Sequence, residues 1–457
     1  MDDNFFEEKR EENVGERIPA PYQSVKKAPI PPKKKVRWGR VAVSLLLAAV
    51  CFGLGAFTVW ASLDGEIRTL LQIKKTIQQD YYEEVSDKEF YKAIFGGINE
   101  KLLDPYSSYM TPEEFAESVS DLEGNRIGIG LVFSGDKENE LRITRVCGNS
   151  PAEAKGIVAG ETIIGIGVSK EQIAPCASFK EFSDFLTEFD EGEVFALQLQ
   201  KGTETRIVEI ARAAYVENLV FYRTNQTSYA FIGEDAEEWL PMSNPLTCLD
   251  AETAYIRLIQ FTGSAAAQFD VAMSQFKQDG KKNLILDLRE NGGGYLDTMQ
   301  SIASYFCKDS QEKKPVVAVA DYGEKRKSFK AYRNDYNEYF TQDSRICVLA
   351  DRYTASASEC LIGCMLDYGA IEFADICLAE RSGVAKTYGK GIMQETKLIN
   401  ILQQDAITLT TAEIRWPISD RSIHGRGVLP EDGALTVEEN VNFETETVNA
   451  IQKLLEK

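Results

Sequence analysis

The stretch from Asn283 to Phe306, NLILDLRENGGGYLDTMQSIASYF, decides the fold class of this chain. It contains an apolar run typical of a buried strand, then a glycine run, then a helical pattern. The strand-like run AYIRLIQF and the helical run AAQFDVAMSQF precede it, and the strand-like runs PVVAVA and RICVLA follow it. Such alternation indicates an α/β layer structure with buried strands. We therefore expect an α/β core from roughly Ala254 onward.

Three glycines, Gly292 to Gly294, follow the predicted strand NLILDLR in this stretch. Glycine allows unusual backbone angles and leaves backbone N–H groups unshielded by side chains. A turn of this kind can provide an oxyanion hole, which needs N–H donors aimed at a developing negative charge. The alternative is an ordinary flexible connection between a strand and a helix.

A second candidate segment, TASASE (354–359), lies between the strand-like RICVLA and the apolar helical run CLIGCML. A serine on the first turn of a helix sits where the helix dipole stabilises negative charge, and the next N–H can donate to an oxyanion. The small neighbours Ala355 and Ala357 leave space for a substrate carbonyl. The alternative is that Thr354, Ser356 or Ser358 only caps the helix.

A lysine between two glycines, Lys390, stands in the segment TYGKGIMQ (387–394). A lysine can act as a general base only if desolvation or a neighbouring dipole lowers its pKa. Gln394, four residues further on, could orient it. The alternative is a solvated loop lysine.

The composition excludes several classes of function. The 457 residues carry a formal charge of −20, which argues against a nucleic-acid partner. The single histidine, His424, excludes a multi-histidine zinc site, and the nine cysteines contain no CxxC pair. Cys360 and Cys364 would share one helix face, where apolar packing is favoured over metal binding. We therefore expect neither a metal nor a cofactor.

An uncharged segment, Val41 to Leu63, is long enough to cross a membrane as a helix. Basic residues, Lys33 to Arg40, precede it, and acidic residues follow it, so the positive-inside rule places the N-terminus in the cytoplasm. We expect a single-pass cell-membrane protein with a disordered cytoplasmic tail and an extracytoplasmic catalytic part. The alternative is a signal peptide cleaved near Trp60.

Residues 125–213 change to short β-like runs with two helical inserts, SPAEAKG and FKEFSDFLTEF. This order is similar to a PDZ domain, in which a glycine turn, here Gly128, Ile129 and Gly130, binds a peptide carboxylate. Phe182, Phe185 or Leu186 would then lie near an apolar pocket. The alternative is an ordinary small β domain. The segment from Val220 to Asp250 fits neither the β-like nor the α/β pattern and is expected to be an elaborated loop.

Five motifs occur in order and carry a family resemblance: LDPYSSYMTPEEF, DLRENGGG, TASASE, TYGKGIMQ and TLTTAEIRWPISDRSIHGRGVLPED. Together with the PDZ-like block they resemble the C-terminal processing peptidases, also called tail-specific proteases, over about residues 64–438. The resemblance implies a serine protease core of the ClpP or crotonase type. It also implies Ser356 as nucleophile, Lys390 as base and Gln394 as its assistant. The oxyanion hole would use the N–H of Ala357 and one from the glycine turn, Gly294 or Gly293.

The resulting hypothesis is a membrane-anchored serine endopeptidase that binds protein or peptide substrates by their free apolar C-termini. One alternative is a catalytically silent PDZ scaffold or adaptor, and another is a cysteine hydrolase using Cys360 or Cys364 with His424 as base. A homo-oligomer is possible. The fold class is α+β and multi-domain, divided as tail 1–40, transmembrane helix 41–63, helical segment 64–124, PDZ-like β domain 125–213, protease core 214–438 and C-terminal helix 439–457.

Overall fold

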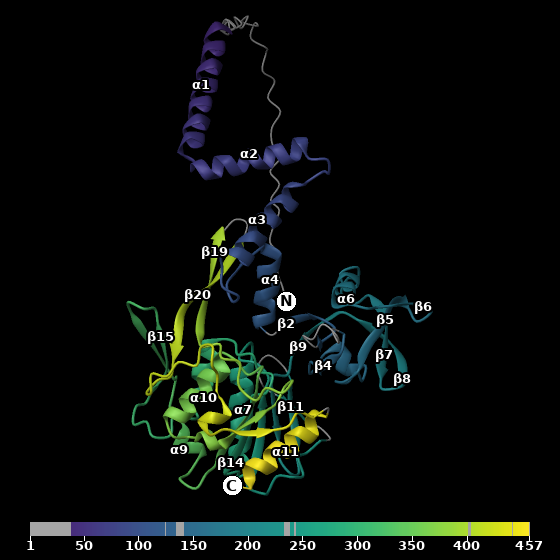
Figure 1. The fold of residues 1–457 in the computed structure, drawn as a ribbon, viewed down its shortest axis with the longest axis vertical. Coiled ribbons are helices and arrows are strands. Elements are labelled where there is room, and N and C mark those ends of the chain that lie inside the picture. The colour runs from purple at the N-terminus through teal and green to yellow at the C-terminus, as the bar shows by residue number, and fades with distance from the viewer. Residues whose placement is uncertain are drawn as a thin grey trace, which may run out of the picture. The chain divides into compact units, whose positions relative to one another are not determined.

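A computed structural model describes residues 38–123, 125–133, 141–232, 238–241, 244–400, 404–440 and 442–456. The chain forms two compact units, Met1–Phe90 and Tyr91–Lys457, and each is described by itself. The expected cytoplasmic tail lies almost wholly outside the described residues. The chain runs from helix α1 at its start to helix α11 at its end (Figure 1).

The first unit contains helices α1 (Trp38–Ser62) and α2 (Gly65–Asp80) and the start of α3 (Asp87–Lys101). Within α1, Ala42–Ser62 is apolar and long enough to span a bilayer, and its side chains are exposed. Length and composition therefore make α1 compatible with a membrane anchor, while the orientation stays a prediction. Asp64 caps α2 by accepting a hydrogen bond from the Glu66 N–H at 3.0 Å.

The second unit opens with the rest of α3, strand β1 (Ser108–Met110) and helix α4 (Pro112–Glu123). Reciprocal hydrogen bonds cap the start of α4: the Glu114 carboxylate accepts from the Thr111 N–H at 2.9 Å, and Thr111 Oγ1 accepts from the Glu114 N–H at 3.3 Å. Strand β1 pairs antiparallel with the distant strand β20 (Asp405–Arg415). Residues 108–110 therefore lie beside a strand from the C-terminal part of the chain.

A small β region follows, with its own apolar core of residues such as Ile143, Phe182 and Phe195. Both helical inserts predicted here are confirmed. Its PDZ-like assignment stays a prediction. Its elements are β2 (Asn125–Gly128), β3 (Leu131–Phe133), β4 (Ile143–Val146), α5 (Pro151–Ala154), β5 (Thr162–Ser169), β6 (Gln172–Pro175), α6 (Phe179–Leu186), β7 (Val194–Lys201), β8 (Glu204–Ala211) and β9 (Ala213–Val216).

An eight-stranded sheet forms the centre of the second unit, in the order β12-β11-β10-β13-β14-β17-β18-β21. Strands β13, β14, β17, β18 and β21 run parallel, as the alternating pattern predicts. The bounds are β10 (Val220–Arg223), β11 (Ser228–Ile232), β12 (Glu238–Pro241), β13 (Thr253–Leu258), β14 (Asn283–Asp287), β17 (Ile346–Asp351), β18 (Ile376–Ala379) and β21 (Leu435–Val437).

The predicted loop between Val220 and Asp250 is wrong where the structure describes it. Strands β10, β11 and β12 extend the sheet as an antiparallel meander, with β10 paired to β13. Val220 and Tyr222 are fully buried. Pairing with β13 gives these short segments the partner that a local sequence pattern does not show.

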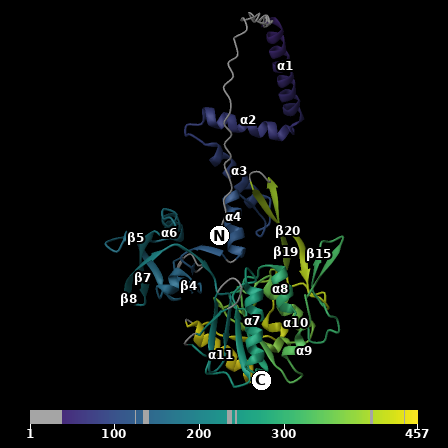
Figure 2. The ribbon, with the colours of Figure 1, turned by 180° about the vertical axis from the view of Figure 1, so that it is seen from behind.

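The two faces of the sheet pack against different helices. On one face, strand residues such as Ile256 and Leu286 form the main apolar core together with residues of three helices, α7 (Ala265–Gln278), α8 (Leu296–Ala303) and α10 (Ala357–Asp367). On the other face, the adjacent residues Tyr255 and Ile285 belong to a second apolar cluster, to which α11 (Phe443–Leu455) also contributes side chains. Helices α7 and α11 accordingly lie on opposite sides of the sheet (Figures 1 and 2). The α/β layer prediction is confirmed, while the ClpP-like assignment stays a prediction.

A second sheet has the order β1-β20-β15-β16, with β19 paired to β20. The strand predicted from PVVAVA is β15, which belongs to this antiparallel sheet and not to the central one. The remaining bounds are β15 (Val316–Asp321), β16 (Arg326–Lys330), α9 (Tyr336–Tyr339), η2 (Phe373–Asp375), β19 (Ile392–Asn400) and η3 (Pro430–Asp432).

Candidate active site

The glycine turn follows β14 and lies against the segment that follows the neighbouring strand β17. Gly293 has φ +99°, and a Cβ placed on it would lie 2.7 Å from Ser356 Cβ and 2.8 Å from the Ala355 oxygen. Gly294 has φ +142°, and its Cβ would lie 2.4 Å from the Phe261 oxygen. Only glycine fits at these two positions, because there is neither space for a side chain nor a favourable backbone angle.

The buried side chain of Asn291 holds this turn in place. Its Oδ1 accepts from the Gly293 N–H at 3.0 Å, and its Nδ2 donates to the Leu258 carbonyl at 2.9 Å. The Gly293 N–H is thus already engaged. In the part of the chain that the structure describes, the N–H of Gly294 has no hydrogen-bond partner. Of the two glycines predicted for the oxyanion hole, Gly294 therefore has the N–H that remains available.

Ser356 differs from the two hydroxyl residues beside it. Thr354 Oγ1 donates to the Leu288 carbonyl at 2.8 Å, and Ser358 Oγ donates to the Asn291 carbonyl at 3.0 Å, and both side chains are fully buried. Ser356 is only half-buried, has φ +58° and borders a cavity of about 530 Å³. Ala357, the first residue of α10, has an N–H that precedes the hydrogen-bond ladder of the helix. The structure therefore presents the hydroxyl of Ser356, and not its neighbours, to the cavity.

The buried carboxylate of Glu359 joins the serine turn to the lysine turn. It accepts from the Ser356 N–H at 3.0 Å, the Gly389 N–H at 2.8 Å and the Lys390 N–H at 2.9 Å. Thr387 Oγ1 donates to it at 2.6 Å. Burial raises the pKa of Glu359, and these hydrogen bonds oppose that change. Sequence reasoning missed this residue, although it stands within the quoted TASASE segment.

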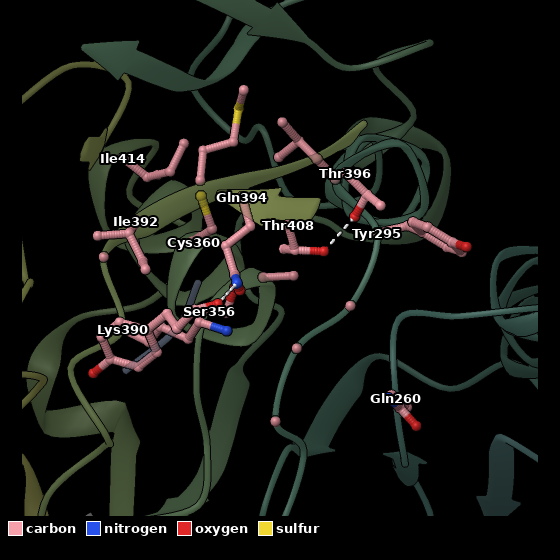
Figure 3. A pocket seen from close by; sticks show the side chains of 18 of the residues that line it. Gln260, Tyr295, Ser356, Cys360, Lys390, Ile392, Gln394, Thr396, Thr408 and Ile414 are labelled. Carbon is pink, nitrogen blue, oxygen red and sulfur yellow. Dashed lines mark hydrogen bonds between the residues drawn. The ribbon is translucent and has the colours of Figure 1, made fainter. Parts of the chain in front are cut away.

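Lys390 is half-buried in the turn just before β19 and borders the same cavity as Ser356. Burial lowers its pKa below the usual value for a lysine, and the nearby Asp104 carboxylate acts in the opposite direction. Figure 3 shows the side chains of Ser356, Lys390 and Gln394 directed toward one part of the cavity. A lowered pKa is what a lysine needs to accept a proton near neutral pH.

Tyr106 completes this side of the cavity and was not predicted as a site residue. Lys390 Nζ lies 5.3 Å from the centre of its ring, and Gln394 Nε2 donates a hydrogen bond to its backbone carbonyl. The signal in the sequence was the motif LDPYSSYM, to which no role was given. Gln394 thus contacts the turn that carries Tyr106.

All six residues predicted for the reaction border this one cavity, in which apolar side chains from β19, β20 and the following loop form part of the wall. The assignment of their roles stays a prediction. The six are Gly293, Gly294, Ser356, Ala357, Lys390 and Gln394.

The alternative nucleophiles are less suitable. Cys360 borders the cavity, but burial raises its pKa to about 12, and burial also raises the pKa of Cys364, whose Sγ lies 4.0 Å from Cys307 Sγ. A thiol with a raised pKa is a poor nucleophile. His424 is exposed and its backbone lies against Gly391. Among the described residues, no cluster of His, Cys, Asp or Glu could hold a metal ion.

A second cavity, of about 490 Å³, lies in the small β region between the segment 127–133 and helix α6. Gly128, Ile129, Gly130, Phe182 and Leu186 line it, as the peptide-binding prediction requires. The sixth predicted residue, Phe185, is not among the lining residues, because its ring packs against Phe189 and Phe195 inside the domain.

Comparisons with known proteins agree with the central part of this description. Residues 252–432 match the model of Peptidase family S41. The "Probable CtpA-like serine protease" of Staphylococcus haemolyticus (strain JCSC1435) is 26% identical over 375 residues, or 80% of this chain and 64% of that protein. A protein of the same name from Staphylococcus saprophyticus subsp. saprophyticus is 25% identical over 368 residues, or 80% of this chain and 65% of that protein.

The chain thus spans less than two thirds of the length of these two relatives. Among solved structures, a "photosystem II D1 C-terminal processing protease" is 20% identical, with a TM-score of 0.47, over 82% of this chain and 89% of that one. Four of the five motifs that suggested a family lie inside the matched region, which includes the glycine turn, Ser356 and Lys390. The fifth motif, LDPYSSYMTPEEF, lies before it. Residues 252–432 of this chain are therefore similar to peptidase family S41.

Proposed function

We propose that this chain is a membrane-anchored serine endopeptidase that cleaves peptide bonds with a Ser356–Lys390 dyad. The observation that carries the proposal is the single cavity bordered by an accessible serine hydroxyl, a lysine with a lowered pKa and a glycine turn. The similarity to proteins named CtpA-like serine proteases supports it.

The proposed reaction begins when neutral Lys390 takes the proton from Ser356 Oγ. The oxygen then attacks the scissile carbonyl carbon, and the N–H groups of Ala357 and Gly294 donate to the oxyanion that forms. The resulting ammonium of Lys390 returns a proton to the leaving amine as the C–N bond breaks. Water, deprotonated by Lys390, hydrolyses the acyl-enzyme in the second half of the reaction. Gln394 acts through its contact with the turn of Tyr106 and not through a bond to the substrate.

For substrate recognition, we propose that the small β region acts as a PDZ domain. Its cavity has a glycine turn at one side and Phe182 and Leu186 at the other, which suits a terminal carboxylate followed by an apolar side chain. The backbone of Gly130 is held by its carbonyl, which accepts from the Cys147 N–H at 2.9 Å. The proposed partners are therefore proteins or peptides with free apolar C-termini.

The membrane anchor in this proposal is helix α1. We propose a single crossing of the cell membrane, with the N-terminus in the cytoplasm and residues beyond Asp64 outside. The support is the apolar length of Ala42–Ser62 and the basic residues before it.

A silent scaffold is the alternative, and the state of Ser356 separates the two functions. A scaffold has no need of a serine held at φ +58° beside a desolvated lysine, since such backbone strain is costly to maintain.

The test compares the full chain in detergent with its Ser356→Ala and Ser358→Ala variants, using an unfolded reporter protein with an apolar C-terminus. Ser356→Ala should abolish cleavage, whereas Ser358→Ala should leave a measurable fraction, because its hydroxyl only bonds the Asn291 carbonyl. Cleavage by Ser356→Ala, or equal loss in both variants, contradicts the proposal.

A further inference from the structure

The turn that carries Tyr106 reaches the cavity from a part of the chain far from the glycine, serine and lysine turns. Asp104 Oδ1 accepts from the Tyr106 N–H at 2.8 Å and from the Ser107 N–H at 3.1 Å. Ser107 Oγ accepts from the Thr410 N–H of β20 at 2.9 Å. Strand β1 then continues along β20. Residues 104–110, which we call the strap, are therefore fixed to the strand that pairs with the Gln394 strand.

Two contacts connect Tyr106 to the proposed catalytic groups. Its ring faces the Lys390 ammonium at 5.3 Å, and its carbonyl accepts the hydrogen bond from Gln394 Nε2. Both Tyr106 and Lys390 are half-buried. The ring therefore takes a place beside Lys390 that water would otherwise fill.

An aromatic ring beside an ammonium group has two opposing effects. The ring face attracts the cation and favours the protonated lysine, whereas the exclusion of water favours the neutral lysine. Burial is the larger cause of the lowered pKa of Lys390. A ring that excludes water from Lys390 therefore acts in the same direction as this larger cause.

Other charged or titratable groups also surround Lys390, and each comes from a different neighbour. Asp104 raises the lysine pKa. Glu359 accepts from the Lys390 backbone N–H, and His424 lies against Gly391. Tyr388, in the lysine turn, forms a side-chain hydrogen bond with Tyr106. The ring of His424 also lies 6.4 Å from that of Tyr106. Replacing the Tyr106 ring therefore removes the contacts with Tyr388 and His424, whereas the backbone contacts with Asp104 and Glu359 do not involve that ring.

We propose that Tyr106 is a positioning residue of the lysine, whose ring shields the Lys390 side chain from water while its carbonyl holds Gln394, so that the active site needs the strap. This inference rests on the proposed Ser–Lys mechanism. It adds a residue outside the region that matches the family.

The test is the pH profile of kcat/KM for the full chain and its Tyr106 variants. Tyr106→Ala opens the site to water and should raise the pKa of Lys390, so we expect the acid limb of the profile to move to higher pH. We expect kcat/KM to fall about tenfold near pH 7, which is less than the loss expected when a general base is removed altogether. Activity should return toward the wild-type value at high pH. Tyr106→Phe keeps the ring, and Tyr106→Leu keeps an apolar cover, so neither should move the limb to higher pH.

Tyr109→Phe is the matched control within the strap. Its hydroxyl donates to Asp405 Oδ1 at 2.7 Å, away from Lys390, so its loss should weaken the strap contact without moving the acid limb. If thermal unfolding shows that Tyr106→Ala does not fold, Tyr106→Ser, which also lacks an apolar cover, replaces it.

The outcomes separate this inference from the function on which it rests. An acid limb that does not move in the folded Tyr106→Ala or Tyr106→Ser variant overturns the role of Tyr106, as does a loss of kcat/KM of equal size at every pH. An upward shift in Tyr106→Leu as large as in Tyr106→Ala also overturns the shielding argument. Cleavage by Ser356→Ala, in contrast, would overturn the dyad itself.

Discussion

Substituting Gly293 with alanine tests whether the glycine turn and Ser356 form one unit. The new Cβ would lie 2.7 Å from Ser356 Cβ, 2.8 Å from the Ala355 oxygen and 2.9 Å from the Ala357 nitrogen. A residue with a Cβ at φ +99° adds strain of about 1–3 kcal/mol. Overlap in a packed region typically costs a further ~1–3 kcal/mol.

The serine turn should relieve this overlap by moving, because the glycine backbone is held by Asn291 and Phe261. The move would displace the Ala357 N–H, and losing one oxyanion donor lowers kcat by roughly 10²–10³-fold. We therefore expect a folded but nearly inactive Gly293→Ala variant with a lowered thermal midpoint.

Gly292→Ala is the matched control, since no atom lies within 4 Å of a Cβ at that position and its φ is not in the left-handed region. The assay is kcat/KM on the unfolded reporter, with thermal unfolding measured on the same samples. A Gly293→Ala variant that keeps wild-type kcat/KM, or a Gly292→Ala variant that loses as much, would refute the close packing of the glycine and serine turns.

Three further predictions follow from the proposed mechanism. Lys390→Arg should be inactive at every pH because a guanidinium does not deprotonate, while His424→Gln should keep most activity because His424 is exposed. The activity of the wild type should rise as the pH passes through the lowered pKa of Lys390. An active Lys390→Arg beside an inactive His424→Gln would contradict the dyad. Amidating the C-terminus of a peptide substrate should lower kcat/KM, because the charge near Gly130 is lost, and equal rates for both forms would rule out carboxylate recognition. Protease added outside intact cells should digest the chain beyond Asp64 and spare a tag at Met1, whereas a protected C-terminal tag would reverse the orientation.

The predictable parts of the site are those with a local signature. A glycine run after a buried strand, a serine before an apolar helix and a lysine between glycines could each be located from the sequence. Their meeting was expected only through the family resemblance, because Ser356 and Lys390 are separated by α10, η2 and β18. Parallel neighbours β14 and β17 bring the glycine and serine turns to the same edge of the sheet.

The unpredicted parts depend on contacts that no local pattern encodes. Glu359 looked like an ordinary acidic residue in the first turn of a helix, yet its carboxylate accepts hydrogen bonds from both functional turns. Tyr106 looked like part of a connection between helices, and its place beside Lys390 arises from the pairing of β1 with β20. Strand β10 was mistaken for a loop for the same reason, since β13 supplies its partner.

A buried charge network links the glycine turn to the C-terminal helix. Arg289, which is fully buried, pairs with Asp287 at 2.6 Å and with Glu446 of α11 at 2.7 Å. Arg381 pairs with the same Glu446 and, at 3.2 Å, with Asp351 at the end of β17.

Each of these charges needs the others, because a single uncompensated charge in such a place costs about 3–5 kcal/mol. Asp351 Oδ1 also accepts from the Glu290 N–H at 3.0 Å, two residues before the first glycine of the run. The ends of β14 and β17, which carry the glycine and serine turns, are therefore held in one arrangement by charges that include a residue of α11. Since α11 lies beyond the region that matches the family, the geometry of the candidate active site involves parts of the chain on both sides of that region: the strap before it and α11 after it.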